Sequence, residues 1–99
     1  MMSNYKYGDM VFAKCQNYPY WPGKVIGSFP HTSSYKVLFY GEKSEATINE
    51  NNIVPFNLDT HRKFAQEPIA KSNRALKFSL KVAMNHFAKR KKGLNSESD

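Results

Sequence analysis

The first half of the chain alternates short apolar stretches with turn residues, a pattern typical of β-strands. Gly41 opens one of the turns, and Pro55 ends the last apolar stretch. The stretches that fit strands, by their β-branched and aromatic content or by their alternation, are 10–15, 24–29, 35–40, 44–48 and 52–54. Five strands this short cannot form a large sandwich, so we predict that they curl into a small antiparallel barrel over about 7–56.

The second half of the chain changes to a helical period. Residues 59–67 can begin with Asp59 or Thr60 as an N-cap and must end near Pro68, which predicts a short helix. A second helix begins at Ser72, where apolar positions recur at helical spacing. Its apolar stripe consists of Leu76, Leu80, Ala83 and Phe87.

Two further features of this half concern the surface of the second helix and the end of the domain. Phe78 and Val82 lie off the apolar stripe, so we expect the second helix to contact another surface or a continuation of the protein. Residues 88–99 are charged and polar, and such ends fray. The chain therefore predicts a single domain over 1–92, with its helical part at about 59–90, and a disordered tail at 93–99.

Charge is distributed unevenly along the chain, whose formal net charge is +7. Residues 1–60 carry five basic and five acidic side chains, whereas residues 61–92 carry ten basic side chains and one acidic side chain, Glu67. A neutral front half with a cationic back half is typical of proteins that bind a polyanion, most often nucleic acid. The alternative is an ordinary solvated, lysine-rich helix.

Several classes of protein are disfavoured by what the chain lacks. A single cysteine, Cys15, cannot form an internal disulfide, and the scattered histidines do not have the spacing of zinc ligands. No apolar run has the length of a membrane span or of a signal peptide, so we expect an intracellular protein or a fragment of one. No nucleophile has an adjacent base, and no carboxylate pair or glycine-rich phosphate loop is present, which argues against an enzyme.

The stretch NYPYWP, at 17–22, concentrates aromatic side chains in a loop. Tyr18, Tyr20 and Trp21 are held by Pro19 and Pro22, which fix φ and lower the entropy of the loop. Rigid rings on a loop between two strands can form the wall of a pocket at the end of a barrel.

A further ring, that of Tyr40, ends a predicted strand just before Gly41 and can lie near this loop. Three ring faces that meet would attract a cation carrying methyl groups, because the faces are electron-rich and the methyl groups are apolar. The alternative is that these rings pack the end of the barrel, as we expect Phe12, Phe39 and Phe56 to pack its core.

A resemblance bears on this choice. The stretch YGDMVFAKCQNYPYWPGKVI (7–26) strongly resembles the opening of PWWP domains, which are named for a Pro-Trp-Trp-Pro motif, here Pro19-Tyr20-Trp21-Pro22. YKVLFYG, SEATI, NIVPF and AKSNRALKFSLKVAM are similar to the later strands and C-terminal helices of that family. The likeness extends from about Tyr5 to Ala83 and is closest to the hepatoma-derived growth factor relatives.

The resemblance implies a five-stranded, SH3-like antiparallel β-barrel followed by a small α-helical bundle, without enzymatic activity or a cofactor. It implies a nuclear chromatin reader whose partners are a methylated histone H3 tail, notably trimethylated at lysine 36, and double-stranded nucleosomal DNA, with a larger chromatin complex as a further expected partner. The implied cage consists of Tyr18, Trp21 and Tyr40, with Cys15 at its rim. Tyr20 would support the fold, and Ser44 and Glu45 would line the path of the histone peptide.

The resemblance also implies a basic surface that contacts DNA, made of Lys14, Lys71, Arg74, Lys77 and Lys81. Phosphate contacts give affinity with little sequence preference, so this binding would be nonspecific and salt-dependent. The run KRKK at 89–92 is a candidate nuclear import signal. Two alternatives stay open, namely a nonspecific DNA-binding module with an idle cage and an SH3-like module that binds a peptide on its rings.

Overall fold

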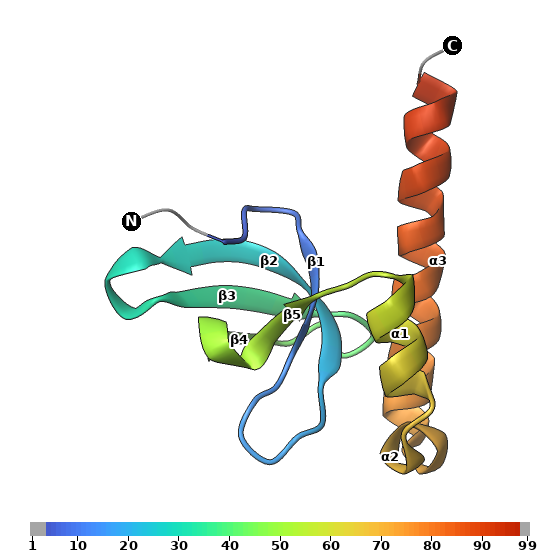
Figure 1. Ribbon diagram of the computed structural model, residues 1–99, viewed down its shortest axis with the longest axis horizontal. Helices are drawn as coiled ribbons and strands as arrows, with labels where there is room; N and C mark the ends of the chain where they lie inside the picture. Colours follow the sequence, from blue (N-terminus) through green and yellow to red (C-terminus); the bar gives the residue numbers. More distant parts are fainter. Residues whose placement is uncertain (1–3, 98–99) are drawn as a thin grey trace.

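The computed structural model describes residues 4–97, and the side chains of residues 4–90. Its first half is a five-stranded antiparallel sheet with the order β4-β3-β2-β1-β5, curled into a small barrel (Figure 1). The strands are β1 (Met10–Ala13), β2 (Trp21–Phe29), β3 (Ser34–Phe39), β4 (Glu45–Asn49) and β5 (Ile53–Pro55). Two 3-10 turns, η1 (Pro30–Thr32) and η2 (Glu50–Asn52), precede β3 and β5. The predicted barrel is confirmed.

Strand β2 begins earlier than predicted, at Trp21 instead of residue 24. Trp21 and Pro22 pair with Ala13 and Phe12 of β1, so half of the aromatic motif belongs to the sheet. Pro22 has no N–H to donate, but its carbonyl oxygen accepts a hydrogen bond from the Tyr40 N–H at 3.0 Å. The strand therefore accommodates proline, and Trp21 is held by the sheet rather than by a loop.

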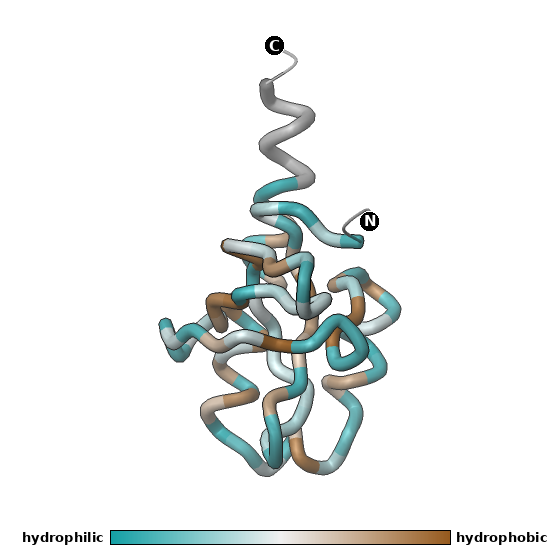
Figure 2. The backbone as a smooth tube through the Cα atoms, turned by 90° about the vertical axis from the view of Figure 1, so that its left-hand side faces the viewer, coloured by the Kyte–Doolittle hydropathy of each residue, from teal (hydrophilic) through white to brown (hydrophobic). Residues whose placement is uncertain are grey.

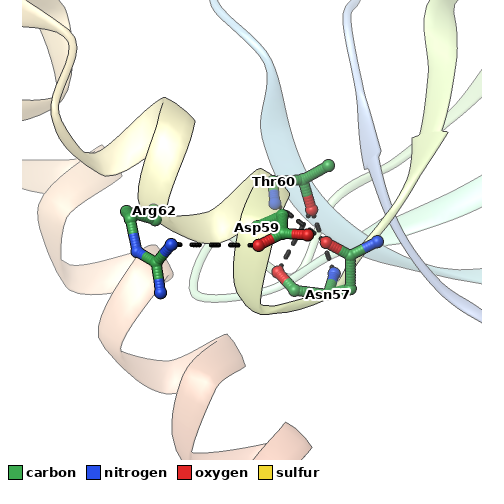
Figure 3. A network of polar contacts seen from close by, with 4 residues as sticks. All are labelled: Asn57, Asp59, Thr60 and Arg62. Atoms are coloured by element: carbon green, nitrogen blue, oxygen red, sulfur yellow. Dashed lines mark hydrogen bonds and ion pairs between the residues drawn. The ribbon is translucent and has the colours of Figure 1, made fainter.

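Helix α1 (Leu58–Ala65) begins with a reciprocal cap, shown in Figure 3. The Asn57 side-chain oxygen accepts from the Thr60 N–H at 2.9 Å, and the Thr60 hydroxyl oxygen accepts from the Asn57 N–H at 3.0 Å. The prediction of Asp59 or Thr60 as the N-cap was therefore wrong, because Thr60 occupies the third position of the helix. Asp59 lies in the first turn and pairs with Arg62 at 3.8 Å.

The rest of the helical part consists of α2 (Pro68–Ser72), which was not predicted, and α3 (Arg74–Glu97). The side chain of Asn73 caps α3 by accepting from the Leu76 N–H at 3.0 Å. In Figure 1, α3 stands beside the barrel, and α1 and α2 pack against its lower half. Helix α3 includes residues 93–97, which the sequence assigned to a tail, and residues 98–99 lie outside the described residues.

A single buried cluster joins the barrel to the helices. The ring of Phe12 stacks on Phe56 with centroids 4.9 Å apart and contacts Phe64 of α1 at 4.7 Å. Phe56 also packs against Phe87 of α3 at 5.2 Å. The predicted stripe of α3 faces this cluster, since Leu76, Leu80 and Ala83 are buried and Phe87 is partly buried against it. Along the chain, short hydrophobic stretches alternate with hydrophilic ones (Figure 2), and the hydrophobic side chains gather in this shared core.

Candidate functional site

A cavity of about 280 Å³ opens at the end of the barrel. Three aromatic side chains line it, from three different segments: Tyr18, Trp21 and Phe39. Cys15 and Pro19 complete its apolar side. The two loop residues, Tyr18 and Cys15, thus lie at the cavity together with Trp21, as the resemblance implied.

The loop between β1 and β2 is tied down at several points. The Lys14 N–H donates to the carbonyl oxygen of Asn52 at 2.9 Å, and the Tyr18 N–H donates to that of Cys15 at 2.9 Å. The ring of Tyr20 stacks on Phe64 with centroids 4.8 Å apart and does not line the cavity, in keeping with a supporting role. These contacts position Tyr18, whose side chain stays 64% exposed.

Trp21 is the least exposed of the three aromatic walls of the cavity. It is 6% exposed, and its indole N–H donates to the carbonyl oxygen of Tyr40 at 3.3 Å. Sheet pairing with Ala13 fixes its backbone. The indole is therefore held in place before any ligand arrives, which lowers the entropy lost on binding.

Tyr40 does not reach the cavity, and Phe39 takes the place that the sequence analysis assigned to it. Successive side chains of a strand point to opposite faces, so Phe39 and Tyr40 diverge. The ring of Tyr40 packs against His86 of α3 with centroids 5.4 Å apart, and burial raises the pKa of its hydroxyl. The expectation that Phe39 serves only the core is corrected too, because it is 8% exposed but lines the cavity.

The remaining side of the cavity is polar and acidic. Glu42 and Ser44 line it from the turn between β3 and β4, and Glu45 lines it from the first position of β4. The Glu45 carboxylate pairs with Lys36 at 3.4 Å, whereas no ion pair of Glu42 with another described residue occurs. Among the described residues, no basic side chain lines this cavity. Electron-rich ring faces beside carboxylates favour a cationic ligand, and the apolar walls favour one that carries methyl groups.

A second hollow, of about 330 Å³, lies between α1, α2 and α3, and we call it the helical groove. Its floor is apolar and consists of Ala65, Ala70, Leu80 and Met84. Its rim carries Lys71, Lys77 and Lys81, which are exposed and form no ion pair with another residue in the part of the chain that the structure describes. The structure thus brings together three of the five predicted DNA contacts.

The other two predicted DNA contacts lie elsewhere. Arg74 is the exposed first residue of α3 and does not line the helical groove. The Lys14 ammonium donates to the carbonyl oxygen of Gln16 at 2.7 Å, within the loop that carries Tyr18. The groove itself was missed in the sequence analysis, because its shape depends on how α2 packs between α1 and α3.

His61 adds no charge to the helical groove at neutral pH. Burial lowers the pKa of its imidazole below the usual 6.5, and a hydrogen bond with the Leu80 backbone opposes this shift in part. His86 behaves similarly, because burial and the nearby charges of Arg90, Lys24 and Lys89 lower its pKa.

The lowered pKa of His61 makes the free energy of unfolding pH-dependent. As the pH falls through about 6.5, the unfolded chain takes up a proton at His61 before the folded chain does, so stability decreases. We expect His61→Gln to reduce this loss between roughly pH 7 and pH 5, as measured by urea denaturation at each pH. If the free energy of unfolding depends on pH equally in His61→Gln and in the wild type, the lowered pKa of His61 is not a cause of the pH dependence.

Two further kinds of site are absent from residues 4–97. No group of three or more His, Cys, Asp or Glu side chains in this range lies in a position to hold a metal ion. Likewise, no helix described here combines the length and the apolar character of a membrane span.

A five-stranded barrel with an aromatic cavity at its end and a basic helical appendage defines an SH3-like binding module. Residues 8–90 match the PWWP domain family, and the chain therefore belongs to this family. PWWP domains are modules that bind chromatin, through histones and DNA, and they are not enzymes. The narrower likeness to the hepatoma-derived growth factor relatives stays a prediction.

Two similar proteins illustrate the likeness. The chain is 28% identical over 98 residues to the cytokine-like nuclear factor N-PAC of Gallus gallus, covering 92% of this chain and 17% of N-PAC. The chain thus spans about a sixth of the length of that relative. The solution structure of a PWWP domain from Schizosaccharomyces pombe has the same fold, with a TM-score of 0.58 and 21% identity, over 81% of this chain and 88% of that chain.

Proposed function

We propose that this domain is a nuclear chromatin reader that binds a methylated histone lysine in the cavity at the end of the barrel. The observation that carries the proposal is the meeting of Tyr18, Trp21 and Phe39 around a cavity with acidic side chains and no basic ones among the described residues. Such walls attract a methylated ammonium by cation–π interaction and by burial of its methyl groups. An unmodified ammonium is more strongly hydrated and gains less. Trimethylated lysine 36 of histone H3 is the first ligand to test, because the resemblance implies it.

The turn between β3 and β4 supports a path for the histone peptide. Ser44 and Glu45, which the sequence analysis assigned to this path, both line the cavity next to Phe39. Glu42 lines it as well and is the carboxylate without a basic partner among the described residues. We therefore assign Glu42 and Glu45 to basic side chains of the histone tail and Ser44 to its backbone.

Nucleosomal DNA is the second proposed partner. Lys71, Lys77 and Lys81 form one basic rim with no carboxylate lining the same groove among the described residues, and Arg74 and Lys14 are further phosphate contacts in this proposal. Three to five phosphate contacts give weak, nonspecific binding. A nucleosome presents the histone tail and the DNA together, so the second contact becomes intramolecular and the two weak sites reinforce each other.

One alternative has a specific observation in its favour. Trp21 is 6% exposed and Phe39 is 8% exposed, so little of either ring face is free. A DNA-binding module with an idle cavity would have this property. Such a module would bind modified and unmodified nucleosomes equally.

The test is a titration of nucleosomes trimethylated at lysine 36 of histone H3 and of unmodified nucleosomes, at two salt concentrations. We expect the methylated nucleosome to bind about tenfold more tightly, since wall contributions of roughly 0.5–2 kcal/mol each separate the two ligands. Raising the salt from about 50 to 200 mM should weaken both complexes roughly fortyfold if three phosphates are contacted. Equal affinities for the methylated and the unmodified nucleosome would favour the DNA-binding alternative. Affinities that do not change with salt would argue against DNA as a partner.

A further inference from the structure

The helical groove has an apolar floor that contacts with DNA phosphates do not require. Leu80 and Met84 of α3 and Ala65 of α1 line the space between the lysines. Ala65 and Met84 are partly buried, so they keep some surface open to a ligand. Phosphate oxygens bind the ammonium groups of the lysines but do not cover an apolar surface. The floor would then stay exposed to water, and its burial would contribute no binding free energy. The floor therefore points to a ligand that brings an apolar group of its own.

The charge of the rim selects among such ligands. Lys71, Lys77 and Lys81 surround the floor, and the other polar residues that line it, His61 and Asn85, carry no negative charge. Long lysine side chains lay their methylene groups along an apolar surface while the ammonium groups stay in water. A complementary ligand has carboxylates around an apolar side chain.

We propose that the helical groove binds an acidic peptide segment of a partner protein, with a leucine- or phenylalanine-like side chain seated against Met84 and Ala65. The groove of about 330 Å³ has room for one such side chain and its flanking backbone. Duplex DNA shares the acidic character of this ligand but has no flexible apolar side chain to seat. The inference uses the lysines assigned to DNA under the proposed function and does not depend on the aromatic cavity.

The described part of the chain itself does not occupy the groove. Helix α3 has 24 residues, so its last residue, Glu97, lies about 35 Å along the axis from Arg74. Figure 1 shows this end of α3 pointing away from α2, next to which the groove lies. We assign the occupant to another protein on the charge of the rim and the apolar floor, and it competes with DNA because both need Lys71, Lys77 and Lys81.

The experiment uses the full chain and two fluorescent peptides. In the first, glutamates flank a central Leu-Phe pair, and in the second, Ser-Ser replaces that pair with the charge unchanged. We expect the Leu-Phe peptide to bind at least tenfold more tightly than the Ser-Ser peptide, and unlabelled duplex DNA to displace it. Equal binding of the two peptides overturns the proposal, because rim charge alone would then account for both.

Variants of the floor and the rim separate this inference from DNA binding. Met84→Gln should remove most of the preference for the Leu-Phe peptide and leave duplex DNA affinity within twofold, whereas Met84→Leu should keep both. Lys77→Gln should weaken the peptide and DNA alike. If Met84→Gln weakens DNA binding as much as it weakens binding of the Leu-Phe peptide, the floor has no role separate from DNA binding. A wild-type protein that binds the Leu-Phe peptide but not DNA would refute the DNA part of the proposed function and leave this inference intact.

Discussion

Tyr18→Ala is expected to weaken binding of the trimethylated nucleosome about tenfold and to leave binding of the unmodified nucleosome within twofold. Tyr18 is the exposed wall of the cavity, at 64%, so its removal takes away a ring face without opening the core. A cation–π contact contributes roughly 0.5–2 kcal/mol, and about 1.4 kcal/mol corresponds to a tenfold change in affinity. Fluorescence polarisation with both nucleosomes at one salt concentration measures the effect, and thermal unfolding should match the wild type.

Matched variants show whether the effect belongs to the ring of Tyr18. Tyr18→Phe keeps the ring face and should retain the preference for the methylated nucleosome. Tyr7→Ala removes a tyrosine that is 72% exposed and does not line the cavity, and it should change nothing. A loss of affinity for both nucleosomes in Tyr18→Ala would mean that the loop contacts DNA instead.

The choice between Phe39 and Tyr40 can be tested in the same assay. Phe39→Leu keeps an apolar side chain in the core but removes the ring, and it should abolish most of the methyl preference. Tyr40→Phe removes a buried hydroxyl that has no hydrogen-bond partner among the described residues, and its binding should equal the wild type. Methyl recognition that depends on Tyr40 and not on Phe39 would contradict the assignment made from the structure.

The parts of the fold that the sequence predicts correctly are those with a strong local period. The stripe of Leu76, Leu80 and Ala83 repeats at helical spacing, and all three side chains are buried. The start of β2 was placed too late because a proline usually interrupts a strand, whereas the Pro22 carbonyl still takes part in the sheet. The cap of α1 was assigned to Asp59 or Thr60, and Asn57 was missed because its reciprocal bonds with Thr60 depend on where the helix begins.

The candidate site, too, was predicted correctly in part and wrongly in part. Two of the walls, Tyr18 and Trp21, follow from the motif in which Pro19 and Pro22 hold the rings, and the structure places both at the cavity, Tyr18 from the loop and Trp21 from the start of β2. The third wall was assigned to Tyr40 although the alternation along 35–40 already places Phe39 and Tyr40 on opposite faces. Deciding which face meets the loop requires knowing where α3 packs, because Tyr40 lies against His86 of that helix. The local pattern of hydrophobic and polar residues does not predict such contacts between segments that are distant in the sequence.

Gly41→Ala is expected to destabilise the domain by about 2–4 kcal/mol, because strain and a steric clash coincide. Gly41 has φ +82°, a left-handed conformation that residues with a Cβ rarely adopt. An added Cβ would overlap the Ser79 hydroxyl oxygen of α3 and would lie 3.1 Å from the Ser79 Cα. Urea denaturation measures the loss, and Gly27→Ala is the matched control because its Cβ would meet only the Lys36 Cβ at 3.5 Å.

The two contributions can be separated through Ser79. The Ser79 hydroxyl is buried and has no hydrogen-bond partner among the described residues, so Ser79→Ala alone should be neutral or slightly stabilising. In the Gly41→Ala/Ser79→Ala double variant the nearest clash is gone, while the backbone strain remains and the Cβ and Cα of residue 79 stay close, at 3.0 and 3.1 Å. We therefore expect partial recovery, read as a coupling free energy in a double-mutant cycle. Additive effects of the two substitutions on the free energy of unfolding would show that the alanine side chain at position 41 does not clash with the Ser79 hydroxyl.

The same contact links the stability of the domain to its cavity. Gly41 directly precedes Glu42, which lines the cavity beside Phe39 together with Ser44 of the same turn and Glu45 at the start of β4. If an added Cβ pushes this turn away from α3, the acidic side of the cavity moves with it. Gly41→Ala should then lose methyl preference even under conditions in which the protein stays folded, and Ser79→Ala should restore part of it. Unchanged methyl preference in folded Gly41→Ala protein would mean that α3 does not position the turn.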